Sequence, residues 1–201
     1  AAIESLCTSA ALLNSGRLEC QGPTASIISR YFKSVCQLQG DMDLANFAQR
    51  PVGRTPILRR LRIASCADPS NPSVPLGDSL HLEFELAAEK PIHDAILLFR
   101  VQTGRGLKLF TCSTRNDLTD RFDVQGTMRA TCVVQNIRLQ PGRYEISVAL
   151  KNALGDILDE IPSGPAFEVV ASNVNGSGRL PPPTSGVLIA DSSWNLTADR
   201  T

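Results

Sequence analysis

The sequence has few aromatic residues and few histidines, and it lacks long apolar runs. Aromatic residues make up 5% of the 201 residues, and two histidines are present. No stretch approaches the ~20 apolar residues that are needed to cross a bilayer. The N-terminus has no basic stretch followed by an apolar core, so no signal peptide is recognisable. These absences predict a cytoplasmic location.

The chain also lacks an excess of charge of either sign. Twenty Lys and Arg residues balance twenty Asp and Glu residues, and the formal net charge is zero. A nucleic-acid-binding surface needs a basic stripe that neutralises phosphates, and the short group of arginines between Arg54 and Arg62 is too small to supply one. The charge balance therefore argues against a nucleic acid as partner.

Cysteine spacings and catalytic signatures are missing as well. The six cysteines show no C-x-x-C spacing and no metal-ligand pattern with His81 and His93. Scattered unpaired cysteines suit a reducing compartment. There is no phosphate-binding loop, no G-x-S-x-G elbow and no H-E-x-x-H helix. Glu83 and Glu85 alternate along one strand, where a solubilising role is favoured over a glycosidase acid pair. The sequence thus predicts a non-catalytic chain that binds no metal or cofactor of its own.

The first part of the chain mixes helix and strand signals. Residues 1–35 show helical spacing of apolar residues, a hairpin centred on Asn14-Ser15-Gly16, and a second helix opened by Gly22-Pro23. This segment is too short to bury a core by itself, so it is predicted to be the edge of a larger domain. Residues 36–55 are polar and are predicted to form a linker, with one short helix around Leu44 and Phe47.

Residues 56–171 have the period of β-strands. Leu80, Leu82, Phe84 and Leu86 alternate with polar residues, and the same alternation recurs from Tyr144 to Leu150. About eight short strands are separated by turn signals, and the strand from Ala95 to Gln102 is predicted to be central because it is apolar on both faces near its start. This pattern is typical of an antiparallel β-sandwich. The predicted fold is therefore mainly β, preceded by the short α/β segment.

The last segment, residues 172–201, begins with a Gly/Ser-rich flexible stretch that is followed by the stiff Pro181-Pro182-Pro183. A further strand-like run lies at Gly186–Ala190. Because an isolated strand is unstable, this run must pair with a sheet edge, in the same sandwich or in a twofold-related copy.

The order of these segments resembles a known family. The segment from Ala1 to Leu18, with Gly22-Pro23 and Tyr31-Phe32, resembles the end of an ABC nucleotide-binding domain, in which the switch histidine would precede Ala1. Three later segments resemble the C-terminal domain of O-antigen polysaccharide exporter ATPases, namely residues 76–84, 109–115 and 141–150. The resemblance covers most of residues 1–35 and 56–170.

The resemblance implies an immunoglobulin-like carbohydrate-binding domain at the cytoplasmic face of the bacterial inner membrane. Such a domain recognises the modified non-reducing end of a finished lipid-linked O-polysaccharide and commits it to export. The family also implies a homodimer that exchanges its last strand, and a transmembrane permease as partner of the ATPase portion. ATP and Mg belong to that portion, and this chain, which lacks its motifs, is not expected to hydrolyse ATP.

Candidate binding residues follow from the strand pattern. Sugar sites usually stack a ring on an exposed aromatic, yet Phe84, Phe99 and Tyr144 fall on core-facing positions. Trp194 is the aromatic residue that remains, and it serves equally well as an anchor for the terminal strand. The other candidates are polar residues on predicted strand faces, namely Arg100, Gln102, Thr111, Ser113, Ser147 and Lys151, together with Arg115 at the end of the strand that carries Thr111 and Ser113.

Several readings of these residues stay open. Ser147 and Ala149 are small and would leave a concavity, and Arg100, Arg115 or Lys151 could pair with an acidic cap on the terminal sugar. The competing interpretation is an ordinary solvated strand face. The alternative functions are a structural dimerisation or regulatory module that binds no glycan, and an exporter domain for another polymer such as teichoic acid.

Overall fold

The computed structural model describes residues 7–14, 16–24, 27, 40–66, 72–172, 179, 182, 186–192 and 194. The chain divides into two compact units, Ala1–Leu38 and Gln39–Thr201. Among the described residues, no helix is long and apolar enough to cross a membrane.

The first unit contains a β-hairpin. Strand β1 (Ser9–Asn14) pairs antiparallel with β2 (Arg17–Pro23), and the tight connection uses Gly16 at φ +79°. A glycine suits this position because it has no Cβ to clash in the left-handed region. The hairpin predicted from the sequence is therefore confirmed. The helix predicted before it lies mostly outside the described residues, as does nearly all of the helix predicted after it.

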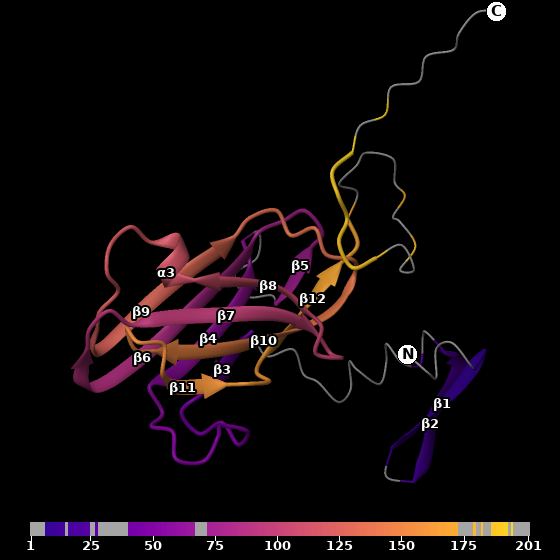
Figure 1. Ribbon diagram of the computed structural model, residues 1–201. Coiled ribbons are helices and arrows are strands. Elements are labelled where there is room, and N and C mark those ends of the chain that lie inside the picture. The colour runs from indigo at the N-terminus through magenta and orange to yellow at the C-terminus, as the bar shows by residue number, and fades with distance from the viewer. Residues whose placement is uncertain are drawn as a thin grey trace, which may run out of the picture. The chain divides into compact units, whose positions relative to one another are not determined.

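The second unit is a sandwich of two sheets (Figure 1). One sheet has six strands, in the spatial order β5 (Ser73–Pro75), β12 (Ala166–Val170), β10 (Gly142–Lys151), β7 (Ile96–Thr103) and β8 (Lys108–Ser113), with β11 (Ile157–Ile161) also paired to β10. The other sheet has four strands, in the order β3 (Asp41–Asp43), β4 (Leu58–Ser65), β6 (Leu80–Ile92) and β9 (Val124–Val134). A short helix, α3 (Thr114–Asp117), follows β8.

The core lies between the two sheets, and period-two alternation supplies it. Leu80, Leu82, Phe84 and Leu86 of β6 are buried, as are the alternate residues of β10 from Tyr144 to Leu150. The rings of Phe84 and Phe99 meet across the core with centroids 5.8 Å apart. The predicted core positions of these strands are confirmed, and so is the central place of β7 between β10 and β8.

Two features give the sandwich its immunoglobulin-like character. The Tyr144 hydroxyl donates a 2.6 Å hydrogen bond to the carbonyl of Gln140, four residues upstream, which is the tyrosine corner of such domains. The chain also changes sheets between β4 and β5, and β5 then pairs parallel with β12. The predicted antiparallel sandwich is thus correct, apart from this one parallel pair among the described strands.

The sequence predicted a linker at residues 36–55, but residues 41–44 belong to the sandwich. Strand β3 pairs with β4, and Leu44 is fully buried in the core. Turns, and not the predicted short helix, occupy the chain around Leu44 and Phe47. A three-residue edge strand shows no period, and its partner β4 lies some twenty residues away, so composition alone indicated a linker. The described part of the sandwich begins at residue 40.

The terminal strand-like run pairs within the same chain. The Gln140 N–H donates to the Val187 carbonyl at 2.8 Å, and the Ile189 N–H donates to the Arg138 carbonyl at 2.7 Å. The side chain of Ile189 is buried, and Arg138 forms an ion pair with Asp191 at 2.6 Å. Of the two pairings left open by the sequence, this single chain shows the run lying along the residues that lead into β10.

Candidate functional site

The outward-facing side chains of β10, β7 and β8 form what we call the polar sheet face. In the strand register Ser147 lies opposite Arg100, and Arg100 lies opposite Thr111, so these three side chains form one row across the sheet. Directly opposed residues of antiparallel strands have Cβ atoms about 5 Å apart. The adjacent row on one side contains Gln102, which lies opposite Glu145.

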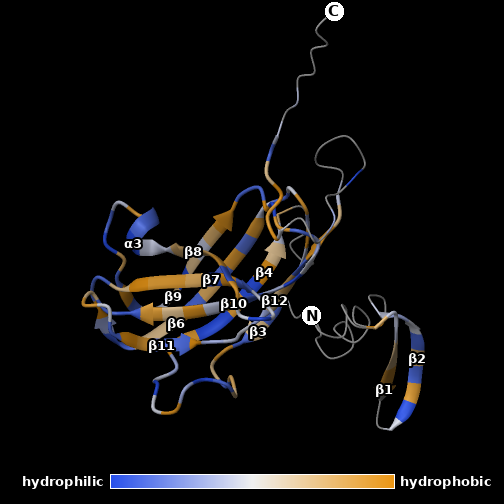
Figure 2. Ribbon diagram, turned by 45° about the vertical axis from the view of Figure 1, so that its right-hand side comes forward, coloured by the Kyte–Doolittle hydropathy of each residue, from blue (hydrophilic) through white to orange (hydrophobic). Residues whose placement is uncertain are grey.

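The floor of this face consists of small and apolar side chains. Ile96, Leu98 and Ala149 form a separate buried cluster, with 6%, 7% and 5% of their surfaces exposed. Ser147 and Ser113 are also buried. Figure 2 shows the apolar character of β7 in the middle of the sheet. Longer polar side chains, Arg100 and Lys151 among them, stand around this floor and are partly exposed.

One end of the polar sheet face is bounded. Helix α3 follows β8, and the Leu97 N–H of β7 donates to the Thr114 hydroxyl at 3.1 Å. The Arg115 Nη2 then donates to the Ala153 carbonyl at 2.8 Å, in the turn between β10 and β11. Because β7 lies between β8 and β10, this contact spans the beginning of β7. At this end of the face, α3 and the β10–β11 turn therefore meet.

The structure brings together six of the eight residues predicted from the sequence. Those on the polar sheet face are Arg100, Gln102, Thr111, Ser113, Ser147 and Lys151. Arg115 was predicted at the end of this strand, and it lies there, in α3, two residues after β8 ends at Ser113. Trp194 is 86% exposed, so its ring is not packed as an anchor for the terminal run, and its role as a stacking residue stays a prediction.

Two acidic residues of the face were missed in the sequence. Glu145 has the same strand parity as Ser147, and its carboxylate accepts a 3.2 Å hydrogen bond from the Ser163 hydroxyl. The alternation of β10 could have revealed it. Glu160 lies opposite Ala149 in β11, but the register shifts between Leu150 and Lys151, and local patterns do not show such a bulge. Carboxylates thus stand beside the cations of the face.

The outer face of the four-stranded sheet has a different electrostatic arrangement. Asp41 pairs with Arg60 at 2.5 Å and with Arg62 at 3.1 Å, and Arg62 reaches Glu83 at 3.2 Å. Partial burial raises the pKa of Asp41, but the hydrogen bonds and charges of the two arginines outweigh this and hold the pKa below its usual value. Glu83 is therefore an ion-pair partner of Arg62, which agrees with the solubilising role and not with a glycosidase pair.

The described residues contain no candidate metal-binding site. Nowhere in the described ranges do three or more His, Cys, Asp or Glu side chains gather in an arrangement that could hold a metal ion. The polar groups of the sheet face are guanidinium, ammonium, carboxylate, amide and hydroxyl groups. Such groups hydrogen-bond to hydroxyl-rich ligands.

The tyrosine corner, the two sheets and the polar sheet face define an immunoglobulin-like domain with a polar outer sheet face. Residues 60–180 match the family model of the Wzt C-terminal domain. This match spans more than half of the chain, and the chain belongs to that family. The family is the C-terminal domain of ATP-binding subunits of O-antigen ABC transporters, with a role in carbohydrate recognition.

Comparison with solved structures supports the β-sandwich fold in one of two cases. The crystal structure of the C-terminal domain of Wzt aligns with a TM-score of 0.58 at 16% sequence identity, covering 70% of this chain and 83% of that chain. At this identity the likeness shows the shared fold. A putative β-galactosidase from Bacteroides fragilis aligns at 22% identity over 50% of this chain and 15% of that one, with a TM-score of 0.35 that is too low to indicate a common fold. No curated protein matches the sequence.

Proposed function

We propose that this chain recognises the modified non-reducing end of a lipid-linked O-antigen polysaccharide and thereby selects finished chains for export. The observation that carries the proposal is the polar sheet face, where a floor of small and apolar side chains is surrounded by hydrogen-bonding groups. A sugar ring has apolar C–H faces and a rim of hydroxyls, so it complements such a surface.

The bounded end of the face supports recognition of a chain end. An open sheet face would accept the interior of a long polymer as readily as its terminus. At one end of the face, the contact between Arg115 and Ala153 marks the junction with the loops. In this proposal a terminal residue, with its extra hydroxyl or its substituent, lies at that junction.

The wider setting of the proposal comes from the family. The domain works at the cytoplasmic face of the inner membrane as a peripheral part of the exporter. Its ATPase portion would hold ATP and Mg and would contact the transmembrane permease. The chain itself supplies no catalytic step, because its role is to bind the glycan.

We further propose that the protein forms a homodimer. The run at Val187–Ile189 makes only a short pairing with the chain before β10, at the far side of a Gly/Ser- and Pro-rich spacer. If two protomers exchanged this run, each copy would keep the same hydrogen bonds. Light scattering on the full chain should give twice the chain mass, and a monomer mass would reject the dimer.

The glycan-binding proposal is tested by titration of the full 201-residue chain. The ligand is the lipid-free O-polysaccharide of the encoding strain, compared with the same polymer after removal of its terminal residue. Calorimetry should show saturable binding of the intact polymer only. Backbone amide shifts should fall on β7, β8 and β10.

Two arginine variants locate the site. Arg100→Ala removes a charged donor from the polar sheet face and should weaken binding about tenfold or more. Arg129→Ala, on the outer face of the four-stranded sheet beside Glu85, is the matched control and should leave the affinity unchanged. If the folded chain binds neither polymer, the glycan proposal fails and a structural or regulatory module becomes the better account.

A further inference from the structure

A polar pocket lies at one end of the sandwich, and we call it the loop-end pocket. Its volume is about 270 Å³. Three connections contribute to its lining: the β6–β7 turn with Asp94, the segment from α3 to Phe122, and the β10–β11 turn with Ala153. The connections come from both sheets, so the rigid sandwich positions all of them.

Other immunoglobulin-like domains also bind ligands at one end of the sandwich. In immunoglobulin variable domains, the loops at one end of the sandwich carry the antigen-binding residues. Loops held on a rigid scaffold combine fixed geometry with free choice of side chain, because they contribute little to the core. The connections that follow β6, β8 and β10 here occupy the same end of the two sheets.

Two guanidinium groups of the pocket have polar partners. Arg115 donates from Nη2 to the Ala153 carbonyl at 2.8 Å, and Nη1 of the exposed Arg121 forms an ion pair with the Asp94 carboxylate at 3.2 Å. Asp94 itself has φ +49°, in the left-handed region, and its N–H donates to the Asp123 carboxylate at 2.9 Å. A non-glycine residue held in that region is a recurrent feature of binding sites.

The other lining groups are an unengaged acid and an apolar wall. No hydrogen bond or ion pair from another described residue reaches the carboxylate of Asp120. Leu118 is 50% exposed, and Phe122 packs against the core behind it. The pocket therefore offers a hydrogen-bond acceptor, two positioned donors and an apolar surface within one small volume.

We propose that the loop-end pocket is a subsite for one neutral sugar residue at the end of the polysaccharide. The proposal rests on the glycan-recognition function above and adds the class of the terminal residue. Asp94 and Asp120 offset Arg115 and Arg121, so the lining has no net charge. A phosphate or carboxylate cap would gain the two arginines but would be repelled by the two carboxylates, whereas sugar hydroxyls can donate to the acids and accept from the arginines.

Size and position agree with a single residue. Pockets for drug-sized ligands begin at about 300 Å³, so a volume of this size suits one ring and not an oligosaccharide. Lys151 of the polar sheet face comes two residues before Ala153 in the pocket. The pocket thus adjoins the bounded end of the face, where the terminus of a bound polymer would lie.

The test uses the full chain and a panel of monosaccharide glycosides, followed by amide shifts in NMR. The neutral probes are the methyl glycosides of glucose, galactose, mannose and rhamnose, and the anionic probes are methyl glucuronide and mannose 6-phosphate. At least one neutral glycoside should shift the amides of residues 118–122 and of Ala153 in a saturable manner. The anionic probes should not do so.

Two matched variants complete the experiment. Asp120→Asn keeps the shape but loses the charged acceptor, and should weaken the neutral glycoside about fivefold or more. Glu85→Gln, an equivalent change on the four-stranded sheet, should have no effect. Stronger binding of the anionic probes, an unchanged affinity in Asp120→Asn, or no shift at the pocket with any probe would overturn the subsite.

The same amides separate this inference from the proposed function. If the intact polysaccharide shifts β7, β8 and β10 but not residues 118–122, the sheet face is the site and the pocket is not. If the polysaccharide shifts neither region, both proposals fail.

Discussion

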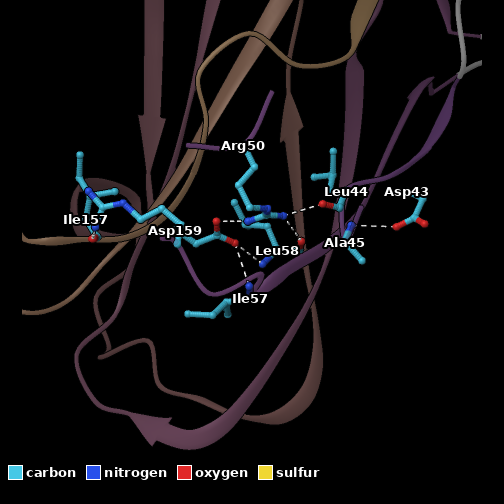
Figure 3. A network of polar contacts seen from close by, with 9 residues as sticks. Asp43, Leu44, Ala45, Arg50, Ile57, Leu58, Ile157 and Asp159 are labelled. Atoms are coloured by element: carbon cyan, nitrogen blue, oxygen red, sulfur yellow. Dashed lines mark hydrogen bonds and ion pairs between the residues drawn. The ribbon is translucent and has the colours of Figure 1, made fainter. Parts of the chain in front are cut away.

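Arg50 and Asp159 form an ion pair inside the sandwich, although 109 residues separate them in the sequence (Figure 3). Their side chains are 8% and 0% exposed. The second oxygen of Asp159 accepts the N–H groups of Ile57 and Leu58, both at 2.8 Å. The guanidinium also donates to the Leu58 carbonyl at 3.0 Å. The pair joins β11 to the chain that leads into β4.

Replacement of the acid in this pair should strongly destabilise the fold. Asp159→Ala leaves the buried Arg50 guanidinium without a counter-charge and two backbone N–H groups without their acceptor. Removal of one partner of a buried pair costs about 3–5 kcal/mol. The free energy of unfolding from urea titration measures the loss. Asp191→Ala removes a 65% exposed carboxylate from the Arg138 pair and should cost less than about 1 kcal/mol. If both variants lost the same free energy of unfolding, the buried Arg50–Asp159 pair would contribute no more to stability than the exposed Arg138–Asp191 pair.

Tyr144→Phe tests the tyrosine corner. The variant keeps the buried ring but loses the hydrogen bond to the Gln140 carbonyl, so the free energy of unfolding should fall by about 1 kcal/mol. Burial raises the pKa of Tyr144 to about 12. Since the folded pKa lies above the unfolded value of about 10, this contribution is complete below pH 10 and is lost as the pH rises toward 12.

The phenolate absorbance of Tyr144 provides an independent check. The difference between the titration curves of the native chain and of Tyr144→Phe isolates this one group. Its midpoint should lie well above the ordinary value for tyrosine. A midpoint near pH 10 would contradict the buried, hydrogen-bonded hydroxyl.

The cysteines should react with iodoacetamide at two distinct rates. Burial raises the pKa of the Cys112 thiol to about 11 and also raises that of Cys132. The thiolate is the reactive form, so these two residues should remain largely unmodified at about pH 8, while exposed Cys7 and Cys66 are alkylated. Peptide mass spectrometry measures the labelling of each residue. In urea the four should label alike, and fast labelling of Cys112 in the folded chain would contradict its burial.

Asp41 should contribute to the loss of stability in acid. Its folded pKa is held below the ordinary value of 3.8, chiefly because the hydrogen bonds from Arg60 and Arg62 outweigh the opposing effect of burial. Its contribution is therefore present above about pH 4 and is lost as the pH falls through the lowered pKa. In Asp41→Asn the unfolding midpoint in urea should depend less steeply on pH below 4. An unchanged slope would show that the pairs with the two arginines do not stabilise the fold.

Much of the polar sheet face could be predicted from the alternation of residues along the strands. In a strand, alternate residues share a side, so the buried positions of β7 and β10 also determine which residues face outward. Arg100, Gln102, Ser147 and Lys151 were identified in this way. Arg115 was predicted at the end of its strand, and it lies in α3, two residues beyond β8, where alternation no longer indicates a side of the sheet.

The sequence by itself determined the β-sandwich, its core positions and the polar parity of its outer strands, since these depend on a local period of two. Only the tertiary structure decided which strands are neighbours, where the sandwich begins and which loops meet at its end. Strand β3, the Arg50–Asp159 pair and the loop-end pocket all join residues that lie far apart in the chain. Such contacts leave no local periodicity, because they arise when distant segments pack around a shared core.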